Sequence, residues 1–168
     1  TSFRNVRRKR KIMSAEERTV WLKACINAAK RKAWALSKVY SVGGVVPKFF
    51  ARERHAILME KIEGTMLNRI RFLEDPLNGL KEIFRTLKKA YVKAGIINGD
   101  LSEYNIMYDG KSYYVIDWPQ AVEVGSPNSQ YLITRDINNI LKFFSRRFKV
   151  QYPYEKAFKY ITLPYTRF

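Results

Sequence analysis

The chain has 168 residues, enough for one domain with a sizeable core or for two small lobes. Hydrophobic residues make up 46% of it and aromatic residues 14%, which excludes an intrinsically disordered chain. The net charge of +17 is extreme for this length, and the single cysteine, Cys25, excludes an internal disulfide. No segment is long and apolar enough to span a membrane. We therefore predict a globular protein of a reducing, cytoplasmic compartment, with no membrane partner.

The elements are predicted from periodicity and from helix and turn signals. In chain order they are a mobile basic loop at 1–14, a helix from a Ser14/Glu17 capping box to about Tyr40, strands at 45–51 and 55–60, a linker at 61–64, a helix from Asp75-Pro76 to Gly95, a hairpin at 104–116, a helix from Tyr131 or Ile133 to Phe148, and a short helix at 154–161.

Apolar residues at helical spacing give the candidate core. The first helix offers Trp21, Ala24, Ala28, Trp34 and Val39. The second offers Leu77, Leu80, Phe84, Leu87 and Tyr91. The third offers Ile137, Ile140, Leu141 and Phe144.

The positive charge is concentrated near the beginning of the chain. Residues 7–11 form an unbroken basic run, and no acidic residue occurs between Glu17 and Glu53. One explanation is a proteome rich in solvated lysine and arginine. The other is a polyanionic partner, such as RNA or a ribosomal particle. A solvated face explains isolated charges better than a five-residue block, so the pattern favours the second explanation.

The segment Asp100-Leu-Ser-Glu-Tyr-Asn105, followed twelve residues later by Asp117, is the strongest chemical signal in the chain. Its D-L-x-x-x-N spacing is that of the second half of a protein-kinase catalytic loop. In such a loop the Asp orients an attacking group and accepts its proton, while the Asn and the later Asp give oxygen ligands to Mg²⁺. The competing interpretation is an acidic surface hairpin, because Asp and Asn are ordinary turn residues.

A hairpin would bring Asp117 beside the segment 100–105. Asp109-Gly110 separates two β-branched and aromatic runs, which predicts a two-residue turn. That turn would pair Tyr108 with Lys111 and Ile106 with Tyr113.

Longer motifs carry a family resemblance. The stretches Gly99-Asp-Leu-Ser-Glu-Tyr-Asn-Ile and Val115-Ile-Asp-Trp-Pro-Gln resemble the RIO family of atypical protein kinases, and the Pro-Gln pair resembles its RIO2 branch. Thr1-Ser-Phe-Arg, the segments around 46–48 and 56–60, and Arg135-Asp-Ile-Asn-Asn-Ile extend the resemblance over nearly the whole chain.

The resemblance implies an α+β, protein-kinase-like fold of two lobes, with the N-lobe incomplete. Residues 1–60 would form the partial N-lobe, with the basic loop, a helix and two strands. Residues 61–168 would form the C-lobe, with the catalytic loop and the metal-binding hairpin.

It also implies the site. Asp100 would be the catalytic Asp, and Asn105 and Asp117 the ligands of Mg²⁺ or Mn²⁺. Asp136 would support the loop. Residues Met59, Glu60 and Ile62 would form the hinge that meets the adenine of ATP.

The implied function is that of a serine/threonine kinase or ATPase that uses Mg·ATP in maturation of the small ribosomal subunit. The basic surface would contact the pre-ribosomal small subunit or its rRNA. The oligomeric state is left open.

Two departures from the family pattern qualify this expectation. A kinase holds phosphates with a Gly-rich loop and a strand Lys, which would precede Thr1 or be lacking, so the chain alone is expected to bind ATP poorly. In addition, Lys32 stands where the resemblance requires a Glu, and Asn98 stands where it expects a His. Lys32 would repel a phosphate-binding Lys instead of pairing with it. These departures leave a second hypothesis open, a RIO-derived pseudokinase that serves as a basic RNA- or ribosome-binding module.

Overall fold

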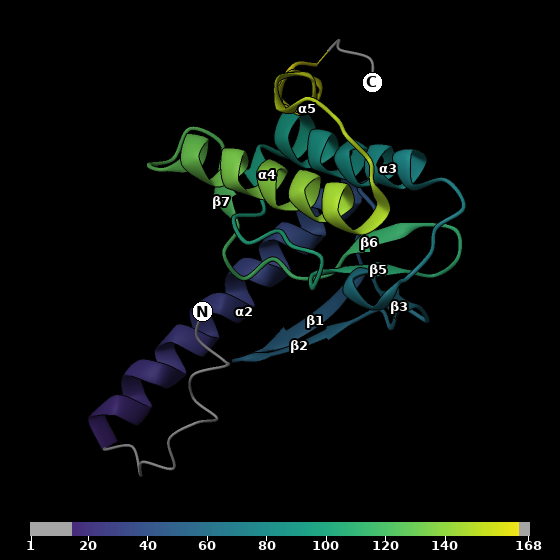
Figure 1. Cartoon of the computed structure of the whole chain (residues 1–168). Helices are drawn as coiled ribbons and strands as arrows, with labels where there is room; N and C mark the ends of the chain where they lie inside the picture. Colours follow the sequence, from purple (N-terminus) through teal and green to yellow (C-terminus); the bar gives the residue numbers. More distant parts are fainter. Residues whose placement is uncertain (1–14, 165–168) are drawn as a thin grey trace.

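The computed structural model describes residues 15–164 as a mixed arrangement of helices and strands (Figure 1). The predicted basic loop, the Thr1 motif and Ser14 of the capping box lie outside the described residues. The elements are α2 (Ala15–Ser41), β1 (Phe49–Glu53), β2 (Ala56–Met59), β3 (Thr65–Met66), the 3₁₀ turn η1 (Leu67–Arg69), α3 (Pro76–Lys88), the π-helical turn η2 (Lys89–Ala94), β4 (Ile96–Ile97), β5 (Ile106–Tyr108), β6 (Tyr113–Val115), β7 (Val122–Glu123), α4 (Ser129–Phe148) and α5 (Tyr154–Thr162).

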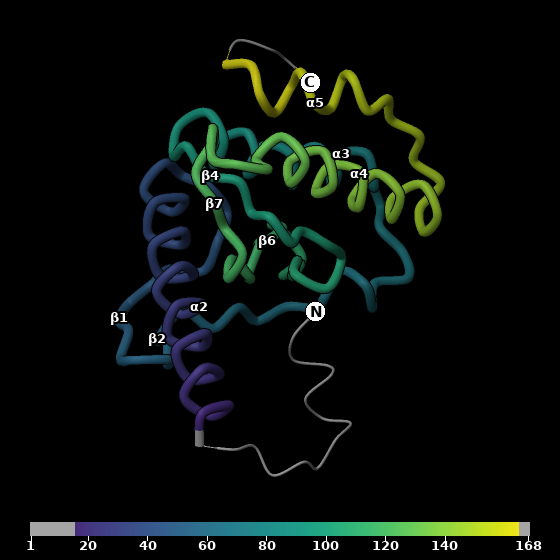
Figure 2. The backbone as a smooth tube through the Cα atoms, turned by 90° about the vertical axis from the view of Figure 1, so that its left-hand side faces the viewer, coloured from purple at the N-terminus to yellow at the C-terminus, as the bar shows by residue number. Residues whose placement is uncertain are grey.

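Only the C-terminal half of α2 is packed against the body of the protein. Leu36 and Val39 are fully buried, whereas Trp21 is 42% exposed and Ala24 is also exposed. The prediction that Trp21 and Ala24 belong to the core was therefore wrong. The N-terminal half of the helix projects away from the other elements (Figures 1 and 2), so its apolar residues have no core to enter.

Helices α3, α4 and α5 form the layer above the hairpin (Figure 1). α3 starts where the sequence predicted, because the side chain of Asp75 accepts a hydrogen bond from Asn78 N at 2.9 Å. Of its predicted inward stripe, Leu80, Phe84 and Leu87 are buried and Leu77 is 39% exposed, while Tyr91 is half-buried and lies in η2. Gly95 ends the helical segment with φ 69°, a left-handed value that glycine adopts without strain. The predicted inward face of α4 is buried at Ile137, Ile140 and Phe144.

The strands form three small antiparallel sheets, with the orders β1-β2, β3-β5-β6 and β4-β7. β1 begins at Phe49 and not at Val45, because the backbone of Val45 is used elsewhere. Val45 N donates to Thr86 Oγ1 at 3.2 Å, and Val45 O accepts from Val115 N at 3.1 Å. Residue 45 thus links the end of α2 to α3 and to β6.

The hairpin register differs from the prediction by two residues. Tyr108 lies opposite Tyr113, and Ile106 lies opposite Val115. The turn is longer than predicted because the carboxylate of Asp109 accepts hydrogen bonds from the N–H groups of residues 111 and 112, at 2.8 and 2.7 Å. A shift of two residues keeps every side chain on its predicted face. Asp117 therefore still follows β6 beside the segment 100–105.

The division into a lobe of residues 1–60 and a lobe of residues 61–168 stays a prediction. Contacts do join the two parts: Lys89 Nζ donates to Gly43 O at 2.6 Å, in addition to the links through residue 45. Within residues 15–164, no helix has the length and apolar character that crossing a membrane requires.

Candidate active site

The loop that carries Asp100 is held by the side chain of Asp136 of α4. This side chain is 1% exposed. Its Oδ2 accepts a hydrogen bond from Gly99 N at 2.7 Å, and its Oδ1 accepts one from Leu101 N at 3.0 Å. Because the two N–H groups lie on either side of Asp100, one carboxylate fixes the backbone around it.

Two further side chains of α4 bind the same loop. The guanidinium of Arg135 donates to Gly99 O, and Asn139 Nδ2 donates to Leu101 O at 3.0 Å. Of these three side chains, only Asp136 is predicted from the family resemblance. The signal that could have found the others is the spacing of Arg135 and Asn139, which are four residues apart and therefore lie on one side of the helix.

Burial dominates the titration of Asp136. It raises the pKa of this carboxyl group to about 6, with a smaller raising contribution from the charge of Asp100. The hydrogen bonds from Leu101 N and Gly99 N and the charge of Arg135 act in the opposite direction. The loop thus depends on a carboxylate that is costly to ionise where it lies.

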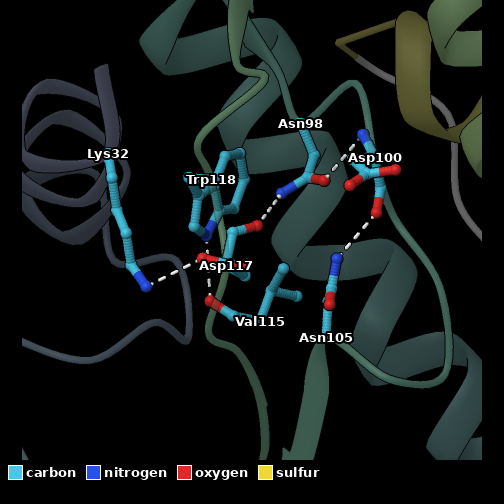
Figure 3. Close-up of polar contacts among 7 residues, drawn as sticks. All are labelled: Lys32, Asn98, Asp100, Asn105, Val115, Asp117 and Trp118. Atoms are coloured by element: carbon cyan, nitrogen blue, oxygen red, sulfur yellow. Dashed lines mark hydrogen bonds and ion pairs between the residues drawn. The ribbon is translucent and has the colours of Figure 1, made fainter. Parts of the chain in front are cut away.

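Asn98 ties this loop to the segment that carries Asp117 (Figure 3). It is buried, its Nδ2 donates to Asp117 O at 2.8 Å, and its Oδ1 accepts from Asp100 N at 3.1 Å. Both ends of the carboxamide are used. Although it stands where the resemblance expects a His, Asn98 makes bracing contacts on both sides.

Asn105 is positioned by the loop and by the hairpin together. Its Nδ2 donates to Asp100 O at 2.7 Å, and its backbone O accepts from Ile116 N at 2.9 Å. The second bond places the segment leading to Asp117 beside Asn105. Figure 3 shows Asp100, Asn105 and Asp117 around this junction.

Asp117 already has a cationic partner. Lys32 Nζ of α2 lies 2.8 Å from Asp117 Oδ1, with side chains that are 19% and 40% exposed, respectively. The family pattern predicts only that Lys32 would repel another Lys. In the structure Lys32 reaches the predicted metal ligand instead, a contact between residues 85 positions apart.

Trp118 fills the space under this corner of the site. It is fully buried, and its Nε1 donates to Val115 O at 2.9 Å. The indole thereby packs without leaving a polar atom unsatisfied. It keeps the backbone of residues 115–118 close against the core.

The predicted hinge residues lie on a different segment from the loop. Met59 ends β2, and Glu60 is held to Lys48 by two hydrogen bonds, Glu60 N to Lys48 O at 2.8 Å and Lys48 N to Glu60 Oε2 at 3.0 Å. Ile62 is half-buried in the stretch before β3. The structure thus brings Asp100, Asn105, Asp117 and Asp136 together through hydrogen bonds, whereas the hinge residues lie on a separate segment of the chain.

The donor atoms fit a hard divalent cation. Within residues 15–164, Asn105 Oδ1 and Asp117 Oδ2 accept no hydrogen bond, and carboxamide and carboxylate oxygens are ligands that Mg²⁺ prefers. The same part of the chain contains no group of three His, Cys, Asp or Glu side chains that could hold a metal ion. Two protein oxygens with water and substrate phosphates are the usual Mg²⁺ arrangement.

A family model, the RIO domain, matches residues 1–157. The chain belongs to the RIO domain family. The RIO-type serine/threonine-protein kinase Rio2 of Methanocaldococcus jannaschii is 32% identical over 96% of this chain and 63% of its own length. The serine/threonine-protein kinase RIO2 of Saccharomyces cerevisiae is 29% identical over 90% of this chain and 37% of its own length.

The solved structures agree with this assignment. The Rio2 kinase of Chaetomium thermophilum, crystallised as an ADP/Mg²⁺-phosphoaspartate complex, matches 99% of this chain with a TM-score of 0.76 and 26% identity. The match covers 53% of that chain. The fold is therefore a partial kinase-like fold, and the RIO domain described here spans between about a third and two thirds of the length of these Rio2 proteins.

The two hydrogen bonds from the loop to Asp136 lead to a stability prediction. Asp136→Ala leaves the buried N–H groups of Gly99 and Leu101 without their acceptor, so we expect the free energy of unfolding to fall by about 2–4 kcal/mol. Asp109→Ala is the matched control, because Asp109 also accepts two backbone N–H bonds but lies exposed in the hairpin turn, where water can replace it. Urea denaturation measures both. Equal losses in the two variants would contradict the brace.

The raised pKa of Asp136 predicts the sign of a pH dependence. The carboxyl group binds its proton more tightly in the folded state, so its contribution to stability is greatest below the unfolded pKa of 3.8 and is lost as pH rises through about 6. We expect the stability of the wild type, relative to Asp136→Asn, to fall by on the order of 1–3 kcal/mol between pH 4 and pH 7. Urea denaturation at several pH values checks this, and a constant difference would show that Asp136 does not titrate there.

Proposed function

We propose that the protein containing this chain is a Rio2-like serine/threonine kinase or ATPase that uses Mg·ATP and acts in maturation of the small ribosomal subunit. Membership of the RIO domain family and similarity to proteins named as serine/threonine kinases support the kinase class. The observation that carries the proposal is the convergence of Asp100, Asn105 and Asp117 on one loop that α4 braces.

Each residue receives a role that its surroundings allow. Asp100 is exposed, so its carboxylate can meet an incoming hydroxyl group or water, orient it and accept its proton. Asn105 and Asp117 hold Mg²⁺ through their oxygens, with Mn²⁺ as the alternative ion. When bound, the ion neutralises charge on the phosphates of ATP. Met59, Glu60 and Ile62 contact the adenine.

The surface of α2 supports a polyanionic partner. Arg18, Lys23, Lys30 and Lys38 are exposed along this helix, and no acidic side chain follows Glu17 within it. Lysine and arginine on an exposed face bind nucleic acid through its phosphates. We propose the pre-ribosomal small subunit or its rRNA as the partner and the cytoplasm as the location.

One observation favours a second candidate function. Lys32 lies 2.8 Å from one oxygen of Asp117, so a cation of the chain itself already neutralises this carboxylate. A RIO-derived pseudokinase that serves as a basic RNA- or ribosome-binding module would keep the fold and the basic helix without needing the metal.

Calorimetry with Mg·ATP tests the enzyme. For the protein of natural length that contains this chain, we expect Asp117→Ala to weaken Mg·ATP binding at least tenfold, since a metal ligand is removed. Asp100→Ala should retain binding and lose turnover, because Asp100 acts on the attacking group. The matched control is Asp109→Ala, which removes an aspartate of the hairpin turn away from the loop. Absence of Mg·ATP binding in the wild type would exclude the enzyme.

RNA binding tests the second candidate. Affinity for a small-subunit rRNA fragment should fall steeply with salt concentration, and the double variant Lys23→Ala/Lys30→Ala should reduce the slope by about 1 for each phosphate that its lysines no longer neutralise. Asp117→Ala should leave this affinity unchanged, because Asp117 pairs with Lys32 and with none of the exposed basic residues named above. Weaker RNA binding by Asp117→Ala, with an unchanged circular dichroism spectrum, would argue against a separate RNA-binding module. Fluorescence anisotropy in a salt series measures each affinity.

A further inference from the structure

Lys32 is held beside Asp117 by the packing of α2. Its neighbours along the helix, Ala29, Ala33 and Leu36, are all buried, so the backbone under Lys32 is fixed against the core. From this anchor, the ammonium group reaches Asp117 Oδ1 at 2.8 Å (Figure 3). The side chain is 19% exposed, about half the exposure of its partner at 40%.

A second contact shows that α2 and the segment after β6 are adjacent over more than one residue. The guanidinium of Arg31 donates a hydrogen bond to Pro119 O at 3.5 Å. Arg31 directly precedes Lys32, and Pro119 lies two residues after Asp117. No acidic residue lies between Glu17 and Glu53 to draw the ammonium group away. Among the described residues, Asp117 is the only carboxylate that pairs with Lys32.

Both cations would be held by one carboxylate group. A Mg²⁺ ion coordinates oxygen at about 2.0–2.1 Å, so an ion on Asp117 Oδ2 would lie within a few ångströms of the ammonium group on Oδ1 and be repelled by it. The competition is strongest where water is partly excluded, as it is around Lys32.

The inference rests on the role proposed above for Asp117 as a metal ligand. We propose that Lys32 is a tethered cation that competes with the divalent metal ion for Asp117 and thereby sets the metal affinity of the site. The flexible four-carbon stem of lysine lets the ammonium group withdraw when the metal binds, without movement of α2. The metal binds more weakly than it would to the same carboxylate with a neutral neighbour.

Binding of Mn²⁺ alone, measured by electron paramagnetic resonance of the free ion, tests the competition without nucleotide or turnover. We expect Lys32→Met to bind Mn²⁺ about tenfold more tightly than the wild type, since the competing charge is gone. Lys32→Arg should not bind it more tightly. Lys30→Met is the matched control: it removes the same charge from an exposed position of α2, and it should leave the affinity within about twofold, because exposed charges are screened.

The unfolding temperature and a second substitution at residue 32 give an independent test of the same competition. Lys32→Gln should behave as Lys32→Met does. In both variants, addition of MgCl₂ should raise the unfolding temperature by more than in the wild type, because a tighter ligand stabilises the folded state more. Asp117→Asn, introduced into the Lys32→Met variant, should abolish this gain.

The outcomes separate the two proposals. If the Lys32 variants bind Mn²⁺ as the wild type does, while Asp117→Asn abolishes binding, competition is overturned and the metal site stands. If neither the wild type nor any Lys32 variant binds Mn²⁺, the metal role of Asp117 is overturned, and the competition with it. Equal tightening by Lys30→Met would also overturn the inference, since the effect would then be general electrostatics.

Discussion

The candidate site depends on one buried carboxylate. Asp136 can hold two backbone N–H groups because α4 is anchored around it by Ile133, Ile137 and Ile140, all of which are buried. An ionised carboxylate in such a place is costly, and its two hydrogen bonds offset only part of that cost, which is why its pKa is raised to about 6. These two hydrogen bonds fix the backbone of the loop on both sides of Asp100. With residues 99 and 101 held, Asp100 O has a defined position and can accept the bond from Asn105.

Asp117 is partly exposed to solvent, whereas Asp136 is buried, and the two carboxylates therefore have different roles. Asp136 binds N–H groups that cannot leave, because they belong to the backbone. Asp117 is 40% exposed and binds an ammonium group at the end of a flexible stem. Its own backbone is fixed by Asn98 and by the buried indole of Trp118. Asp117 thus combines a fixed backbone with a partner that can be exchanged, which is the arrangement expected of a ligand site. Asp136 has permanent partners and serves to position the loop.

The sequence predicted the elements well and the contacts between them less well. Helix signals such as Asp75-Pro76 and Gly95 are local, so α3 and its end were found where predicted. The predicted hairpin register was wrong because the Asp109 side chain closes a longer turn. The predicted position of Asp117 was unaffected, since a shift of two residues keeps each side chain on the same face of the hairpin. Trp21 was assigned to the core by its apolar character, although helical spacing cannot tell how far along a helix the body of the protein extends. The pairing of Lys32 with Asp117 has no local signal at all, since it joins residues 85 positions apart.

That pairing changes how the departure at residue 32 is understood. Considered against the family pattern alone, a lysine there is the loss of a glutamate that would orient a phosphate-binding lysine. In the folded chain the same ammonium group neutralises Asp117, so the charge of this carboxylate is balanced before any ligand arrives. Balance of this kind is compatible with both proposed functions. The enzyme needs the ammonium group to withdraw, and the stem of Lys32 allows withdrawal while Ala33 and Leu36 remain buried. A binding module does not use the metal, so there the ammonium group can stay on Asp117. The two functions therefore make opposite demands on this ion pair, which the enzyme has to open and the binding module does not.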